Sequence, residues 1–185
     1  FALGIAVVSV GGVLIFAFTR QVFHPAARWA RMAVTHAVLV HAVVAVGLIR
    51  ASSRGTTLPE ILTHTRPWAC ALVGVLSLAF AWAAVAAFRY FAMQRRKLAL
   101  GLADPVVTNR FLLWGLANGA ISLLCATLIL CLMAKMVILR DPLPLTIIGA
   151  VGVPASAAWY LTFFPPARYV ESIRRRAAAA SAATR

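Results

Sequence analysis

Acidic side chains are nearly absent from this sequence. Its 185 residues include only four, at Glu60, Asp104, Asp141 and Glu171, and all four lie between or at the ends of long apolar runs. No carboxylate is therefore available inside an apolar run for proton relay, metal ligation or general acid–base catalysis. This absence disfavours a pump or transporter and is one reason to expect a protein without enzymatic activity.

Cysteine is scarce, and several catalytic motifs are missing. Cys70, Cys125 and Cys131 all fall inside apolar runs and have no CxxC spacing, which argues against a disulfide framework or a zinc site. The sequence has no Gly-rich phosphate loop after a strand, no serine in a nucleophile elbow and no His-Glu-x-x-His helix. We expect no catalytic residues and no metal site.

Apolar residues, in contrast, make up 63% of the sequence. A soluble protein of this size cannot bury so much apolar surface, so lipid must cover the excess. Crossing a hydrocarbon layer of about 30 Å takes about 20 helical residues. The runs that come close to or exceed this length cover about residues 2–18, 32–49, 68–88, 111–132 and 143–164. They predict an all-α polytopic transmembrane bundle over residues 1–164, with further spans possible upstream, and a basic tail over residues 165–185.

The distribution of basic residues predicts the orientation. The net charge is +14, and the 18 Lys and Arg side chains are concentrated around the apolar runs. Thirteen fall on one side of the predicted bundle and five on the other. The positive-inside rule places the larger set in the cytoplasm. We therefore expect a multi-pass protein of a bacterial inner membrane with a cytoplasmic C-terminus, and no nucleic-acid partner.

Local motifs predict where helices begin and end. Asp104-Pro105 and Asp141-Pro142 each combine a capping side chain with a proline at the first helical position, so both pairs predict helix starts. The segment Thr57–Glu60 has the spacing of a capping box and predicts one or two helical turns lying at the outer surface. Pro165-Pro166 should end the fifth span.

The basic tail has two interpretations that the sequence leaves open. Residues 167–180 form either an amphipathic helix on the membrane surface or a solvated alanine-rich extension. As a helix, the segment would turn Tyr169, Val170 and Ile173 toward lipid. Three arginines would then contact anionic lipid headgroups, namely Arg174, Arg175 and Arg176.

Histidine is the only residue type that suggests a ligand site. His41 lies in the middle of the second apolar run, where an ionisable side chain needs a polar partner within the protein. Candidate partners are Ser77, Asn118 and Ser122. His36 is a weaker candidate, because five residues place it about 140° from His41 around a helix, too far for both to bind one metal from the same side.

A second possible role for His41 is as the single axial ligand of a tetrapyrrole. Ala37 and Ala45 flank it on the same helix face, which leaves room for a flat macrocycle or for the close approach of another helix. This pattern indicates haem or (bacterio)chlorophyll as the possible cofactor. The structural alternative is a histidine that hydrogen-bonds to a neighbouring helix.

The clearest packing signal lies in the fourth run. Gly115 and Gly119 have a GxxxG spacing, Ser122 extends the small face, and Asn118 lies beside it. Such a face lets a second helix approach closely, with polar side chains available for hydrogen bonds between the helices. We predict a tight contact here, made either within the chain or with another subunit.

These patterns favour a non-enzymatic membrane protein, either an accessory or assembly subunit of a larger membrane complex or the membrane-embedded part of a sensor. A haem- or chlorophyll-binding subunit that uses His41 is the alternative, and a small transporter or channel comes third. Partners would be the lipid bilayer with its anionic lipids, and other membrane subunits or further copies of the chain.

Overall fold

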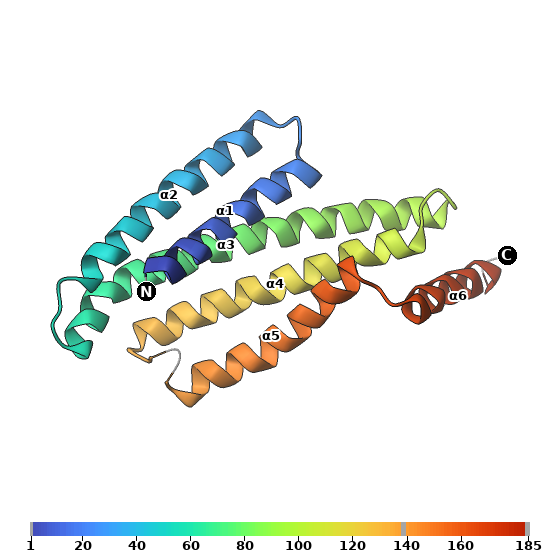
Figure 1. The fold of residues 1–185 in the computed structure, drawn as a ribbon. Helices are drawn as coiled ribbons and strands as arrows, with labels where there is room; N and C mark the ends of the chain where they lie inside the picture. Colours follow the sequence, from blue (N-terminus) through green and yellow to red (C-terminus); the bar gives the residue numbers. More distant parts are fainter. Residues whose placement is uncertain (1, 138–139, 184–185) are drawn as a thin grey trace.

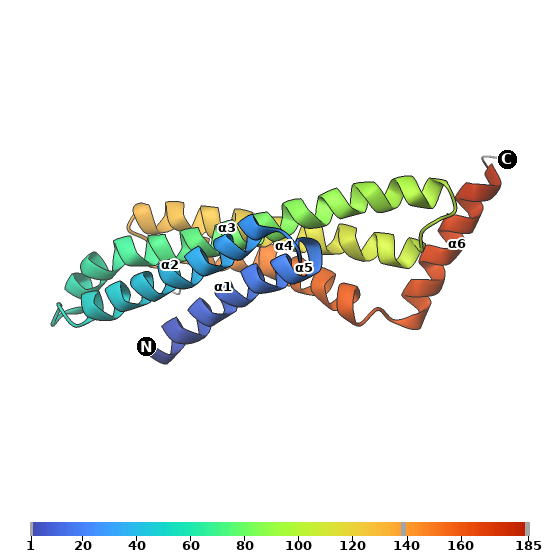
Figure 2. The same ribbon diagram turned by 90° about the horizontal axis from the view of Figure 1, so that it is seen from above.

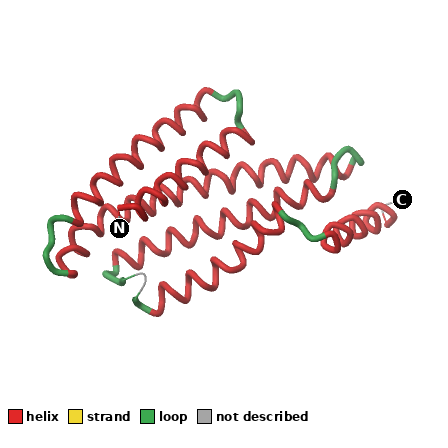
Figure 3. Tube along the Cα trace, in the orientation of Figure 1, coloured by secondary structure: helices red, strands yellow, loops and turns green. Residues whose placement is uncertain are grey.

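The structure is a computed structural model that describes residues 2–137 and 140–183, and helices with short connections account for nearly all of these residues (Figures 1 and 3). Phe1 and Arg185, the outer ends of the predicted bundle and tail, lie outside the described residues. The described residues contain no strand. The helices are α1 (Ala2–Phe23), α2 (Arg28–Ser52), α3 (Leu58–Ala99), α4 (Pro105–Met133), α5 (Pro142–Phe163) and α6 (Ala167–Ala183).

Helices α1 to α5 are each long and apolar enough to cross a membrane. The prediction of an all-helical chain with five apolar spans is therefore confirmed. Each helix contains one of the predicted apolar runs almost entirely. The chain exposes 11481 Å² of surface, whereas a compact soluble protein of its mass would expose about 8,600 Å². The additional surface is what a bundle covered by lipid or by partner helices requires.

Helices α3 and α4 form the centre of the bundle. Among the described residues, α1 and α2 pack on α3 and on each other, while α5 packs mainly on α4. The α1–α2 hairpin and α5 therefore lie on opposite sides of the central pair, as the ribbon shows (Figure 1). Aromatic rings add contacts between α1 and α4 and between α5 and α3. Small side chains permit the close central contact, because Ala79, Ala83, Ala84 and Ala87 of α3 are almost completely buried.

Helix α3 is much longer than its predicted span. It has 42 residues and is therefore about 63 Å long, about twice the thickness of a hydrocarbon layer. The capping box at Thr57 does not form a separate short helix at the outer surface, as we expected, but begins α3 itself. Glu60 accepts a hydrogen bond of 3.0 Å from the backbone N–H of Thr56, and the helix continues through Pro67.

The other predicted helix ends are confirmed. Helix α4 begins at Pro105, and the Asp104 carboxylate accepts a hydrogen bond of 2.7 Å from the backbone N–H of Val106. Helix α5 begins at Pro142 and ends at Phe163, before the Pro165-Pro166 pair. Asp141 does not cap α5 with its side chain. Its carboxylate accepts a hydrogen bond from the backbone N–H of Val137 and thus closes the preceding turn.

The residues after Pro166 form a helix, as the first of the two interpretations of the tail expects, and its contact with a membrane surface stays a prediction. Helix α6 lies across the end of the bundle, at a steep angle to the other helices (Figure 2). Among the described residues it contacts only α4. The hydroxyl of Tyr169 accepts a hydrogen bond of 2.9 Å from the side-chain amide of Asn109. Tyr169 is therefore directed at α4, and our expectation that it faces lipid is wrong.

Candidate functional site

His41 points into the protein, as we predicted, and is only 2% exposed. Its Nδ1 lies 2.8 Å from the backbone carbonyl oxygen of Ala37, one turn earlier in α2. Because a carbonyl oxygen can only accept, Nδ1 carries the hydrogen atom and donates a hydrogen bond to that oxygen. The partner that we expected on a neighbouring helix is not used. Ser77 and Ser122 bond to each other instead.

The other ring nitrogen of His41 lies directly against α1. A Cβ built on Gly12 would be 2.4 Å from Nε2, so the Gly12 Cα lies within about 4 Å of that nitrogen. Nε2 is buried and has no hydrogen-bond partner among the described residues. In this arrangement the backbone of α1 lies next to Nε2, on the side where the macrocycle of a bound tetrapyrrole would have to fit. Tetrapyrrole binding itself stays a prediction from the sequence.

His36 is not part of the same site. Its Nδ1 lies 2.8 Å from the carbonyl oxygen of Met32, on the exposed surface of α2. It lines a shallow surface depression with Arg28 and Arg31. No group of three or more His, Cys, Asp or Glu side chains in the part of the chain that the structure describes could hold a metal ion.

The GxxxG face of α4 contacts α3. A Cβ on Gly115 would lie 2.8 Å from two carbon atoms of the Phe88 ring, so this ring rests on the glycine backbone. At Gly119 the nearest atom is the Cβ of Ala84, at 3.9 Å from the same built position. Both glycines thus face another helix, and the contact is made within the chain.

Polar side chains hold α3 and α4 together beside these glycines. The Ser77 hydroxyl lies 3.1 Å from the Ser122 carbonyl oxygen, and the Ser122 hydroxyl lies 3.0 Å from the Ser77 carbonyl oxygen. Such reciprocal bonds fix how the two helices align along their length. Asn118 is completely buried and donates a hydrogen bond of 2.8 Å to the carbonyl oxygen of Trp114 in its own helix. Asn118 therefore does not bridge the helices.

The three arginines of α6 are exposed. Helix α6 places them near the end of the bundle where α1 joins α2 and α3 joins α4 (Figure 1). The larger predicted set of basic residues is therefore gathered at this end, apart from Arg185, which lies outside the described residues. A helix that lies across the bundle end with exposed arginines suits contact with anionic headgroups.

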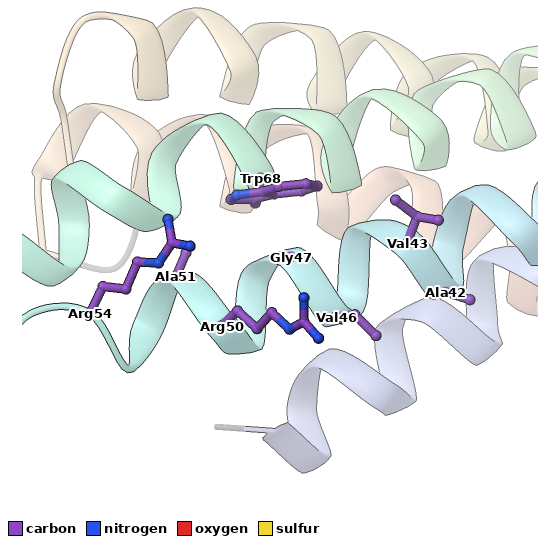
Figure 4. A pocket seen from close by; sticks show the side chains of 8 residues that line it. All are labelled: Ala42, Val43, Val46, Gly47, Arg50, Ala51, Arg54 and Trp68. Atoms are coloured by element: carbon purple, nitrogen blue, oxygen red, sulfur yellow. The ribbon is translucent and has the colours of Figure 1, made fainter.

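A groove at the opposite end of α2 was not predicted. It has a volume of about 450 Å³, and its charged part is formed by Arg50 and Arg54. Figure 4 shows these side chains at one end, with the indole of Trp68 from α3 alongside. A Cβ on Gly47 would lie only 2.3 Å from the Trp68 ring, so the indole is packed against bare backbone. The only sequence signal was the spacing of four residues between the arginines.

We compared the chain with protein-family models, with curated proteins and with solved structures, and found no match.

Proposed function

We propose that this chain is a non-enzymatic accessory or assembly subunit of a larger membrane complex, and that α5 is its partner-binding helix. One observation carries the proposal. Helix α5 is the least covered of the five spans, because only 11% of its most apolar stretch is buried, against 22–33% in the other four. A span that packs mainly on one neighbouring helix leaves most of its surface free for a partner protein.

The exposed face of α5 has the composition of a helix-packing surface. Small residues recur at helical spacing along one exposed stripe, formed by Thr146, Gly149, Ala150, Val153, Ser156 and Ala157. A Cβ on Gly149 would meet no atom within 4 Å, so no helix of this chain covers that glycine. Pro154 has no N–H, so the carbonyl oxygen of Ala150 loses its usual hydrogen bond within the helix. In a membrane, a neighbouring helix can donate a hydrogen bond to such an oxygen.

Cross-linking tests the α5 face directly. A photoreactive amino acid at position 153 should form an adduct with a different membrane protein in native membranes, because Val153 is 70% exposed at the centre of the stripe. The matched control is position 123, since Leu123 is 71% exposed in the middle of α4. It should form mainly lipid adducts. Mass spectrometry of both products identifies the cross-linked molecule.

Three outcomes of this experiment are informative. A protein adduct at position 153 that disappears in the Gly149→Leu variant supports the proposal, because leucine would fill the surface needed by the partner. Lipid adducts alone at position 153 would overturn it. An adduct with a second copy of the chain would also overturn it, and would assign the face to a homo-oligomer.

The membrane of this protein and its orientation form part of the same proposal. We propose a bacterial inner membrane with α6 in the cytoplasm, because three connections, α1–α2, α3–α4 and α5–α6, lie at the same end of the bundle (Figure 1) and carry most of the basic residues.

Cysteines replacing Ser53 and Ala178 should react with a membrane-impermeant reagent from opposite sides. In intact cells only the residue-53 variant should be labelled, and labelling of both would contradict the proposed orientation.

A further inference from the structure

We propose that the groove at the end of α2 is a binding site for one anionic phospholipid of the outer leaflet, with the phosphate between Arg50 and Arg54 and an acyl chain along α2. The groove has a charged end and an apolar end. Arg50 and Arg54 form the charged end, whereas Ala42, Val43 and Val46 line the rest (Figure 4). This pattern matches a molecule with an anionic head and an apolar tail.

The two guanidinium groups are exposed and free to bind an anion from outside the chain. Neither side chain has an ion pair or hydrogen bond within the described residues. Of the four carboxylates in the sequence, the nearest along the chain is Glu60, which accepts hydrogen bonds from Thr56. A guanidinium group can donate two parallel hydrogen bonds to the oxygens of one phosphate. Two arginines at one groove end can therefore hold a phosphate diester.

Trp68 and Gly47 give the groove a preformed wall. The Trp68 ring lies against the Gly47 backbone with no side chain between them. Gly47 is buried, and Ala51 beside it is only 4% exposed. Tryptophan favours the boundary between headgroups and hydrocarbon, where its ring is apolar and its N–H remains hydrated. This ring marks the depth at which the headgroup of a bound lipid would lie.

The apolar part of the groove decides between a lipid and a free anion. Residues 42–46 belong to the apolar run of α2, inside the hydrocarbon layer. Val43 is 62% exposed and Val46 is 49% exposed, and at this depth an acyl chain reaches both. An inorganic phosphate would contact only the arginines, and an acidic soluble peptide cannot enter the hydrocarbon layer.

Native mass spectrometry of the detergent-purified protein tests the site. One phosphatidylglycerol should be retained in preference to phosphatidylcholine of the same chain length. The Arg50→Gln/Arg54→Gln variant should lose this lipid at least about ten-fold more readily, because two cations close to the phosphate are removed. Arg66→Gln/Arg140→Gln is the matched control, since it removes two charges at the same end of the bundle outside this groove. It should retain the lipid.

Two further measurements distinguish a lipid from a free anion. Val46→Phe adds bulk to the apolar part without touching the arginines and should also weaken lipid retention. Millimolar inorganic phosphate should not displace the lipid. The proposal is overturned if the Arg50→Gln/Arg54→Gln variant binds phosphatidylglycerol as the unaltered protein does, if phosphatidylcholine binds equally well, or if inorganic phosphate alone displaces the lipid. Circular dichroism spectra should show that each variant remains folded.

Discussion

Replacing Gly115 with leucine should destabilise the protein by about 1–3 kcal/mol in detergent. Even one added carbon at this position would lie 2.8 Å from the Phe88 ring. A leucine must therefore either turn this ring, which is 38% exposed, away from α4 or push the two central helices apart. Unfolding by a denaturing detergent, followed by circular dichroism, measures the loss.

Gly119 provides the control for this prediction. A Cβ there would meet only the Ala84 methyl group, at 3.9 Å, which is an ordinary van der Waals contact. Gly119→Ala should therefore change the stability by less than about 0.5 kcal/mol, whereas Gly115→Ala should already destabilise the protein measurably. Equal stability of the two alanine variants would show that Phe88 does not rest on Gly115.

The second large effect is expected at Gly12. Gly12→Leu should also reduce stability by about 3 kcal/mol, because its Cβ would lie 2.4 Å from His41 Nε2 and 2.8 Å from a Leu76 methyl carbon. The adjacent Gly11 is a closely matched control, since a Cβ there meets nothing within 4 Å. Gly11→Leu should leave the stability in detergent nearly unchanged.

A double-mutant cycle can attribute this effect to His41. Gly12→Ala alone should be destabilising, but the same change in a His41→Ala background should be tolerated better, because the imidazole that it meets is gone. We expect a coupling free energy of about 1 kcal/mol or more between the two positions. Strict additivity would show that the histidine does not contact α1.

Much of the fold could be predicted because its causes are local. The spans follow from runs of apolar residues, and the start of α4 follows from a capping aspartate next to proline. The length of α3 could not be predicted in the same way, because hydropathy indicates where a span ends and not where a helix ends. Residues 89–99 include four basic side chains but no glycine or proline, so α3 continues to Ala99. It ends just before Gly101, which has a φ of 70°.

The candidate sites were less predictable because they depend on which helices meet. The inward direction of His41 follows from the energetic cost of a polar ring in lipid, but its proton acceptor depends on a side-chain rotamer that bonds to its own helix. Gly12 meets side chains of α2 and α3, and Gly47 meets the Trp68 ring of α3, so both contacts depend on how separate helices pack. A single glycine in an apolar run does not show what will pack on it.

The packing order of the helices has a consequence for how the protein is made. Among the described residues, each span from α2 to α5 packs on the span immediately before it. Contacts between non-consecutive helices add to these: α1 packs on α3 and, through the rings of Phe18 and Phe23, on Trp114 of α4. Chains are synthesised from the N-terminus, so every new span enters a bilayer that already holds its neighbour. Gly12 and His41 can meet as soon as α2 is inserted, before α3 exists. The bundle can therefore assemble one span at a time, without waiting for its C-terminal helices.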